Sequence, residues 1–154
     1  MLARDIMETR FHTLRPDETV AQAVKMFQTA GRVEGKKIFG LIVVGDGERL
    51  VGMLSMYDIL LFIQPKHMKI LGEMADLEAD RLFEDLLGRV KDIRVGDIMT
   101  TQVVTIGPET HILSISELMI NKHIRRLPVS EGGRIVGIVY ISDVFYHMLK
   151  KFLD

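Results

Sequence analysis

The chain has 154 residues, of which 47% are apolar and 27% charged, and its 20 Lys+Arg and 21 Asp+Glu give a formal net charge of -1. This balance argues against a basic nucleic-acid-binding face and against a polybasic membrane-surface protein. The absence of cysteine excludes disulfides, thiolate catalysis and Cys-ligated metal sites. The longest apolar run, Ile38–Val44, is far shorter than a membrane helix, and MLARDIMETR shows no signal-peptide core. We therefore expect a globular protein of the cytoplasm without membrane contact.

The sequence contains an internal duplication. Several residues of the first half recur in the same order in the second half. They are the single residues Thr13, Pro16 and Asp58 and two tripeptides. The matching pairs are Asp5-Ile6-Met7 with Asp97-Ile98-Met99, Thr13 with Thr105, Pro16 with Pro108, Leu50-Val51-Gly52 with Ile135-Val136-Gly137, and Asp58 with Asp143. Their common order predicts repeat 1 over residues 1–63 and repeat 2 over 95–154, on either side of a dissimilar segment, 64–94. Repeat 1 carries several additional residues, mostly around Gly31–Lys37.

The pattern of each repeat predicts five secondary-structure elements in the order β-α-β-β-α. In repeat 1 a short strand over 11–14 precedes a helix with Val20, Ala23, Val24 and Phe27 on one apolar face. Two β-rich runs over 38–44 and 49–54, joined by Gly-Asp-Gly, then precede a helix over 57–63. Repeat 2 predicts the same series. Its first strand covers 103–106 and its first helix 112–119, and two further strands over 125–129 and 134–139 precede a helix over 142–152. The fold class is therefore α/β, of the α+β type.

The segment between the repeats also has helical spacing. Over 68–90, apolar residues alternate with charged ones at helical intervals, and we expect a helix that is interrupted near Gly88. Two roles remain open for it: a cover on the edge of the module, or a contact with a second copy or a partner protein.

Two stretches of repeat 2 carry a resemblance to a known family. They resemble the cystathionine-β-synthase (CBS) domain, and they are Ile124-Arg125-Arg126-Leu127-Pro128-Val129 and Gly137–Asp143. Repeat 1 resembles the domain more loosely, because it has Phe39-Gly40-Leu41-Ile42-Val43 in place of the basic-Leu-Pro-Val string. Two such domains in tandem resemble a Bateman module. The resemblance implies a pseudo-two-fold pair that forms homodimers and binds AMP, ADP, ATP or S-adenosylmethionine in clefts between the repeats. It also implies regulation of an effector protein, which the sequence does not identify, and no obligatory cofactor.

The resemblance also assigns roles to individual residues. Asp58 and Asp143, each in the first turn of a closing helix, would accept hydrogen bonds from ribose hydroxyls, although an Asp at this place is also a common helix cap. The remaining assignments are ribose or phosphate binding for Ser55, Ser142, Arg125 and Arg126, and the border of the adenine slot for Thr13, Thr105 and Tyr140.

Two departures from the family pattern bear on the ligand. Tyr140 stands where a Ser or Thr is usual, and it could stack on a base, block the cleft or pack internally. The residues directly before each aspartate, Met56-Tyr57 and Ile141-Ser142, supply no arginine, which favours AMP over ATP.

No motif in the sequence indicates an enzyme. There is no HExxH or GxSxG motif, and Gly31–Lys37 only approaches a phosphate-binding loop, with Lys37 in place of the magnesium-binding hydroxyl. We expect a non-enzymatic sensor without a metal site that binds an adenine nucleotide and signals to a partner. The alternative is a ligand-free assembly module with degenerate clefts; nucleic-acid binding is a third possibility, which the net charge opposes.

Overall fold

The computed structural model describes residues 1–64 and 76–153, which form two compact units. Unit 1 comprises Met1–Phe11, Gly45–Leu50 and Gln102–Asp154, and unit 2 comprises His12–Val44 and Val51–Thr101. The first residues of repeat 1 thus pack in the unit built on repeat 2, whereas residues 95–101 pack in the unit built on repeat 1. The boundaries predicted above follow the duplication in sequence rather than these units, and they stay a prediction.

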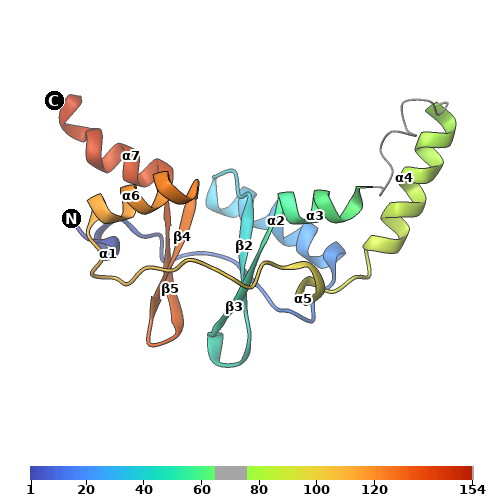
Figure 1. The fold of residues 1–154 in the computed structure, drawn as a ribbon, viewed down its shortest axis with the longest axis horizontal. Helices are drawn as coiled ribbons and strands as arrows, with labels where there is room; N and C mark the ends of the chain where they lie inside the picture. The colour runs from blue at the N-terminus through green and yellow to red at the C-terminus, as the bar shows by residue number, and fades with distance from the viewer. Residues whose placement is uncertain (65–75, 154) are drawn as a thin grey trace. The chain divides into compact units, whose positions relative to one another are not determined.

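Unit 2 is built around a three-stranded sheet in the order β1-β2-β3. Figure 1 labels its strands β2 and β3. Its elements are β1 (Thr13–Leu14), α2 (Val20–Glu34), β2 (Gly40–Val44), β3 (Leu50–Ser55), α3 (Met56–Ile63), α4 (Asp76–Val90) and α5 (Val95–Ile98). Strand β1 is parallel to β2, with Thr13 opposite Ile42. All five residues of the central strand β2 are buried, as a continuous apolar run predicts for a strand covered on both faces.

Helix α2 shows how the sequence pattern determines packing. Thr19 caps its N-terminus through a capping box with Gln22. Val20, Ala23 and Phe27 are buried as predicted. Val24, predicted on the same face, is instead 44% exposed, because helical spacing puts it at the margin of the stripe formed by the buried residues.

Unit 1 is built on an antiparallel hairpin. Its elements are α1 (Ala3–Ile6), the short helix η1 (Asp46–Glu48), α6 (Ile112–Lys122), β4 (Arg126–Glu131), β5 (Arg134–Tyr140), α7 (Ile141–Leu149) and a final turn, η3 (Lys150–Phe152). Arg126 of β4 lies opposite Tyr140 of β5. Ile106 adds a single parallel bridge to Val129. The core of this unit contains Ala3, Ile6, Ile106, Ile112, Ile115, Met119, Leu127, Val129, Val139 and Val144.

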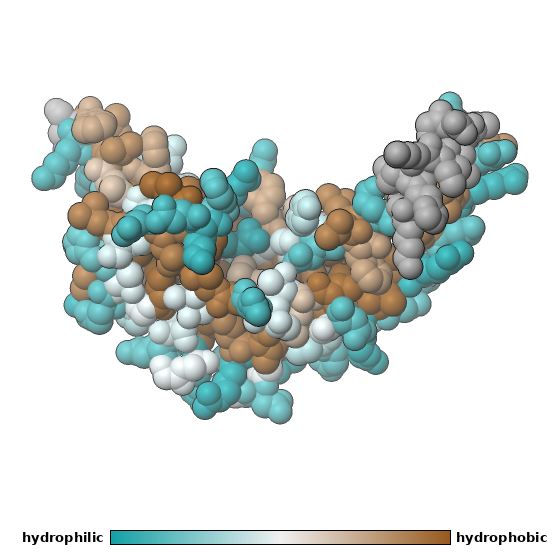
Figure 2. All heavy atoms as spheres, viewed as in Figure 1, coloured by the Kyte–Doolittle hydropathy of each residue, from teal (hydrophilic) through white to brown (hydrophobic). Residues whose placement is uncertain are grey.

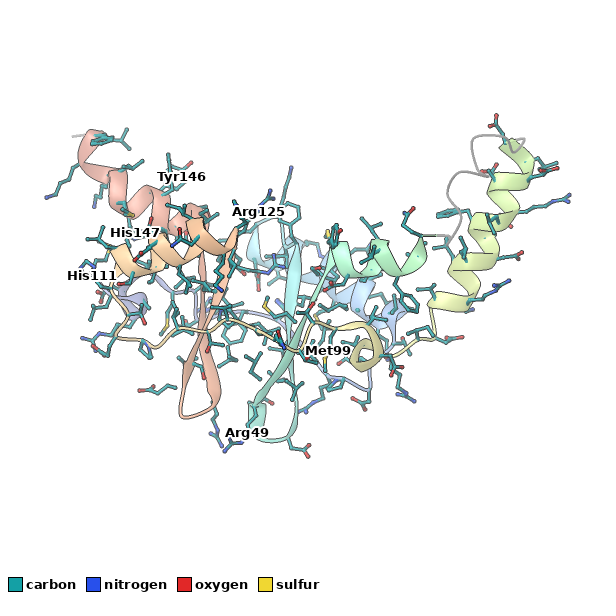
Figure 3. All side chains as sticks on the ribbon, in the orientation of Figure 1. Arg49, Met99, His111, Arg125, Tyr146 and His147 are labelled. Atoms are coloured by element: carbon teal, nitrogen blue, oxygen red, sulfur yellow. The ribbon has the colours of Figure 1, made fainter. Side chains whose placement is uncertain are left out.

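The repeated Asp-Ile-Met motif has a structural explanation. It lies in two four-residue helices, α1 and α5, and each ends with a methionine placed against a strand glycine. A Cβ on Gly137 would lie 2.7 Å from the Met7 Sδ, and one on Gly52 would lie 2.8 Å from the Met99 Sδ. Figure 3 shows Met99 beside β3. Glycine is required at both positions because the approach leaves no room for a side chain.

Most elements agree with the sequence prediction, and the differences have local causes. The strands predicted over 11–14 and 103–106 shrink to Thr13–Leu14 and the one bridge at Ile106. The interruption predicted near Gly88 is wrong: α4 continues to Val90, because an isolated glycine lowers helix stability without breaking a helix. Part of the predicted central helix, 68–75, lies outside the described residues. In the described part of the chain, no helix has the length and apolar character to cross a bilayer.

Candidate functional site

The same backbone contact organises the candidate site in each unit. In unit 2 the Met56 N–H, at the start of α3, donates to the Phe39 carbonyl just before β2 (2.8 Å). In unit 1 the Ile141 N–H, at the start of α7, donates to the Arg125 carbonyl just before β4 (2.9 Å). Each bond holds the first turn of a closing helix beside the residue that precedes a core strand. The duplication therefore places Asp58 and Asp143 in equivalent local settings.

In unit 2, Asp58 is part of a reciprocal capping box. The Asp58 N–H donates to the Ser55 Oγ, and the Ser55 N–H donates to the Asp58 Oδ2, both at 2.9 Å. The second carboxylate oxygen, Oδ1, accepts a long contact of 3.5 Å from the Thr100 hydroxyl. Both Ser55 and Asp58 are half-buried. One oxygen therefore fixes the helix start, and the other faces a hydroxyl group at hydrogen-bonding range.

In unit 1, the corresponding turn is built differently. Tyr140 takes the N-cap position of α7, where its side chain forms no capping bond. Asp143 is half-buried at the third helical position, as Asp58 is in α3. The His147 Nδ1–H donates to the Asp143 backbone carbonyl at 2.7 Å, so His147 contacts the main chain of Asp143 rather than its carboxylate.

The structure brings the predicted residues of repeat 2 together at one end of the hairpin. Arg126 faces Tyr140 across β4 and β5, and Arg125 contacts the start of α7 through its carbonyl. Arg125 is exposed and Arg126 half-buried, as the opposite faces of successive strand residues predict. Figure 3 shows Arg125 at the beginning of β4. A carboxylate and guanidinium groups gathered in this way can accept hydroxyl hydrogens and bind phosphate oxygens, respectively.

The two predicted threonines differ in setting. Thr13 is half-buried in β1, paired with Ile42 of the strand that begins at Gly40. Thr105 is exposed and outside any strand, directly before the bridge residue Ile106. Ser142, in the first turn of α7, is also exposed. A strand position therefore explains Thr13 without a ligand, but it does not explain Thr105.

One site neighbour escaped the sequence prediction. Thr100 approaches Asp58 from the segment after α5, which belongs to repeat 2 in sequence but packs in unit 2. Only its position next to the repeated Asp-Ile-Met motif marks it in the sequence. Within the described residues, no three His, Asp or Glu side chains come together in a way that could hold a metal ion.

The geometry defines a duplicated module with one hydroxyl- and carboxylate-lined helix start in each repeat, and comparison with known proteins identifies its class. The family model of the CBS domain matches residues 3–65 and 95–150. The chain belongs to the CBS domain family, with two copies of the domain in tandem.

Individual relatives agree with this assignment. CBSX2, a chloroplastic CBS domain-containing protein of Arabidopsis thaliana, is 29% identical over 91% of this chain and 60% of its own length. The crystal structure of CBSX2 in complex with AMP superposes with a TM-score of 0.70 at 26% identity, covering 98% of both chains. The cytosolic domain of the Mg2+ channel MgtE in complex with ATP gives a TM-score of 0.68 at 25% identity, over 94% of this chain and 47% of that one.

The similarity to an enzyme is confined to part of that enzyme. Inosine-5'-monophosphate dehydrogenase of Korarchaeum cryptofilum is 29% identical over 87% of this chain, but the match spans only 21% of the dehydrogenase. CBS pairs are typically regulatory. The similarity therefore gives no reason to assign dehydrogenase chemistry to this chain.

Proposed function

We propose that the chain is a non-enzymatic sensor that binds an adenine nucleotide at the Asp58 and Asp143 helix starts and passes its occupancy to a partner protein. The observation that carries this proposal is the repeated placement of an aspartate at the third position of a helix whose first N–H is bonded to the residue before a core strand. The AMP and ATP complexes of CBSX2 and MgtE support an adenine nucleotide as the ligand.

Each residue has a role in this proposal. Asp58 and Asp143 accept hydrogen bonds from ribose hydroxyls, since a charged acceptor strengthens such bonds. Ser55, Ser142, Arg125 and Arg126 contact ribose or phosphate, and Thr13, Thr105 and Tyr140 border the adenine. Arg125 and Arg126 point to opposite faces, so one guanidinium is available to a phosphate group in the cleft. The residues two positions before the aspartates, Met56 and Ile141, are exposed and apolar and add no positive charge. AMP is therefore the proposed ligand of these two sites in preference to ATP.

Calorimetric titration of AMP into three proteins tests this assignment. We expect binding to the unaltered chain, at least tenfold weaker binding to Asp143→Ala, and none to the double variant Asp58→Ala/Asp143→Ala. The matched control is Thr19→Ala, which removes the capping box of α2 but leaves both helix starts intact. Unchanged AMP affinity in a folded double variant would contradict the assignment.

We further infer that the chain forms a homodimer through α6 and α7. Both helices expose large apolar side chains, including Ile120 (65%) and Phe145 (56%). The two helices also line an apolar hollow of about 260 Å³. Figure 2 shows brown and tan apolar atoms along α6 and α7. A contiguous apolar surface of this kind marks an interaction site, because single apolar side chains alone would need no cover.

Sedimentation velocity distinguishes this interface from one on α4. Phe145→Asp is expected to give monomers, whereas Phe83→Asp, at a phenylalanine of α4 with 54% exposure, should leave the dimer intact. The reverse pattern would assign the interface to α4. A monomeric unaltered chain would contradict dimerisation itself.

The rival function is a ligand-free assembly module. Tyr140 at the N-cap of α7 and Phe39 in place of an arginine favour it, because both put apolar rings where the family pattern has polar groups. It predicts that dimerisation persists while no nucleotide binds. The cytoplasmic location and the absence of catalysis likewise stay predictions from the sequence.

A further inference from the structure

Helix α4, light green in Figure 1, has an apolar stripe that the described residues of unit 2 cover on one side only. The helix contacts α3, Val90 is 6% exposed, and Leu82 and Leu86 are half-buried. Phe83 and Leu87, one turn apart and continuous with this stripe, are instead 54% and 39% exposed. Single exposed apolar side chains need no partner, whereas an exposed pair that extends a packed stripe forms an unpartnered helix face.

Carboxylates border the exposed part of this stripe. Asp80 lies three residues before Phe83, and Glu84 lies three residues before Leu87, so each acid is a surface neighbour of one apolar side chain. Both acids are exposed, and within the described part of the chain neither takes part in an ion pair. These four residues, Asp80, Phe83, Glu84 and Leu87, are called the α4 face below.

The positive charges of α4 lie mainly away from this face. The helix carries five carboxylates and two arginines. Arg81 and Arg89 each lie four residues from Asp85, on the side of the helix opposite the two exposed apolar side chains. Arg81 is also three residues from Glu84, whereas Asp80 has a carboxylate at both positions four residues away and no arginine at helical spacing. The α4 face therefore keeps an excess of negative charge.

The acidic border decides which kind of partner fits this face. The same face of a second copy would bring carboxylates against carboxylates, and like charges across an interface oppose association. Nucleic acids and anionic lipid surfaces are excluded for the same reason, because both attract basic side chains. An amphipathic helix with lysine or arginine beside its apolar side chains complements both the apolar pair and the carboxylates.

We propose that the α4 face binds a basic amphipathic helix of a partner protein, whose apolar side chains pack on Phe83 and Leu87 while its cations face Asp80 and Glu84. The signalling role of this contact rests on the proposed function, but binding itself requires no nucleotide. Because the face has only two large apolar side chains, the contact is weak and suits a transient signalling complex. Its exposed charges make the affinity fall as the salt concentration rises.

Fluorescence anisotropy with a labelled helical peptide tests the charge of the face. The probe consists of leucine and lysine, with leucine at every third or fourth position, and a second peptide has glutamate in place of lysine. We expect the unaltered chain to bind the lysine peptide only, and Asp80→Asn/Glu84→Gln to weaken this binding by about three- to tenfold. The matched control, Glu78→Gln/Asp85→Asn, neutralises the same two residue types at exposed positions of α4 outside the face and should retain the affinity.

The apolar pair is tested by Phe83→Ala/Leu87→Ala, which should weaken the lysine peptide by at least about tenfold. Because both side chains are exposed, this variant should keep the melting temperature and the oligomeric state of the unaltered chain. A melting temperature lowered by several degrees would show that the chain itself covers the face. Loss of a dimer in sedimentation velocity would assign the face to a second copy. Either result would overturn the proposal.

The outcomes separate this face from the AMP sites. The lysine peptide should bind to Asp58→Ala/Asp143→Ala with unchanged affinity, and Asp80→Asn/Glu84→Gln should bind AMP as the unaltered chain does. A failure of the AMP assignment therefore leaves the peptide test intact, and the reverse also holds. Equal binding of the two peptides, no binding of the lysine peptide to the unaltered chain, or equal weakening in the matched control would overturn the proposal.

Discussion

Replacing Gly52 with alanine probes the contact between β3 and the segment after α5. An alanine Cβ would lie 2.8 Å from the Met99 Sδ and 2.8 Å from the Thr100 carbonyl oxygen. The methionine side chain can move, but the carbonyl cannot move easily, because Met53 N–H donates to it (2.9 Å) and Thr100 N–H donates back to the Met53 carbonyl (2.8 Å). Overpacking of this kind costs about 1–3 kcal/mol of unfolding free energy. For a chain of this size the melting temperature should fall by roughly 2–10 °C.

Urea and thermal unfolding, followed by circular dichroism, measure this loss. Gly88→Ala is the matched control, because its Cβ would meet nothing within 4 Å inside α4. That exchange should raise the stability by up to about 1 kcal/mol, since alanine is the better helix former. A Gly52→Ala variant whose stability lies within about 0.5 kcal/mol of the unaltered chain would refute the argument, because that is the range of a neutral surface substitution.

Further predictions concern the core and the helix caps. Leu127→Ala, at a fully buried position of unit 1, should lower the unfolding free energy by about 2–5 kcal/mol in urea titrations, and a loss below about 1 kcal/mol would contradict its place in the core. Thr19→Ala and Ser55→Ala should each cost about 1 kcal/mol, because each removes the side chain that caps a helix. Calorimetry should show weaker AMP binding only for Ser55→Ala. Equal AMP affinities in the two cap variants would remove Ser55 from the site.

The sequence predicted the elements well wherever hydrophobic spacing is long and regular. The helix from Val20 and the strand ending at Val44 follow directly from such spacing. The four-residue helices α1 and α5 escaped prediction, because they are too short for a helical period to show. The glycine-containing turns were predictable in kind, and Gly47, Gly132 and Gly133 do adopt positive φ.

The duplication did not show which residues pack together in each of the two units. Spacing compares residues within one repeat, whereas the chain packs Met1–Phe11 with repeat 2 and residues 95–101 with repeat 1. For the same reason the contact between Thr100 and Asp58 was not foreseen. Two residues far apart in sequence reveal their contact only when the path of the chain between them is known.

The sequence placed the candidate site residues at the starts of the closing helices, but it did not show the bonds that these residues form, and their binding roles stay a prediction. Asp58 was expected either to cap a helix or to bind a ribose, and the structure shows the capping bonds directly. These bonds leave the ribose role a proposal, since the second carboxylate oxygen accepts only the long contact from Thr100.

Thermal unfolding of the unaltered chain with AMP, ADP, ATP and S-adenosylmethionine tests the central claim most directly. A ligand at about 100 times its Kd stabilises the folded state by about 2.7 kcal/mol. For this chain that stabilisation corresponds to a rise in melting temperature of roughly 5–10 °C. The account predicts such a rise with AMP. An unchanged melting temperature with all four ligands would contradict a nucleotide sensor and favour the assembly module.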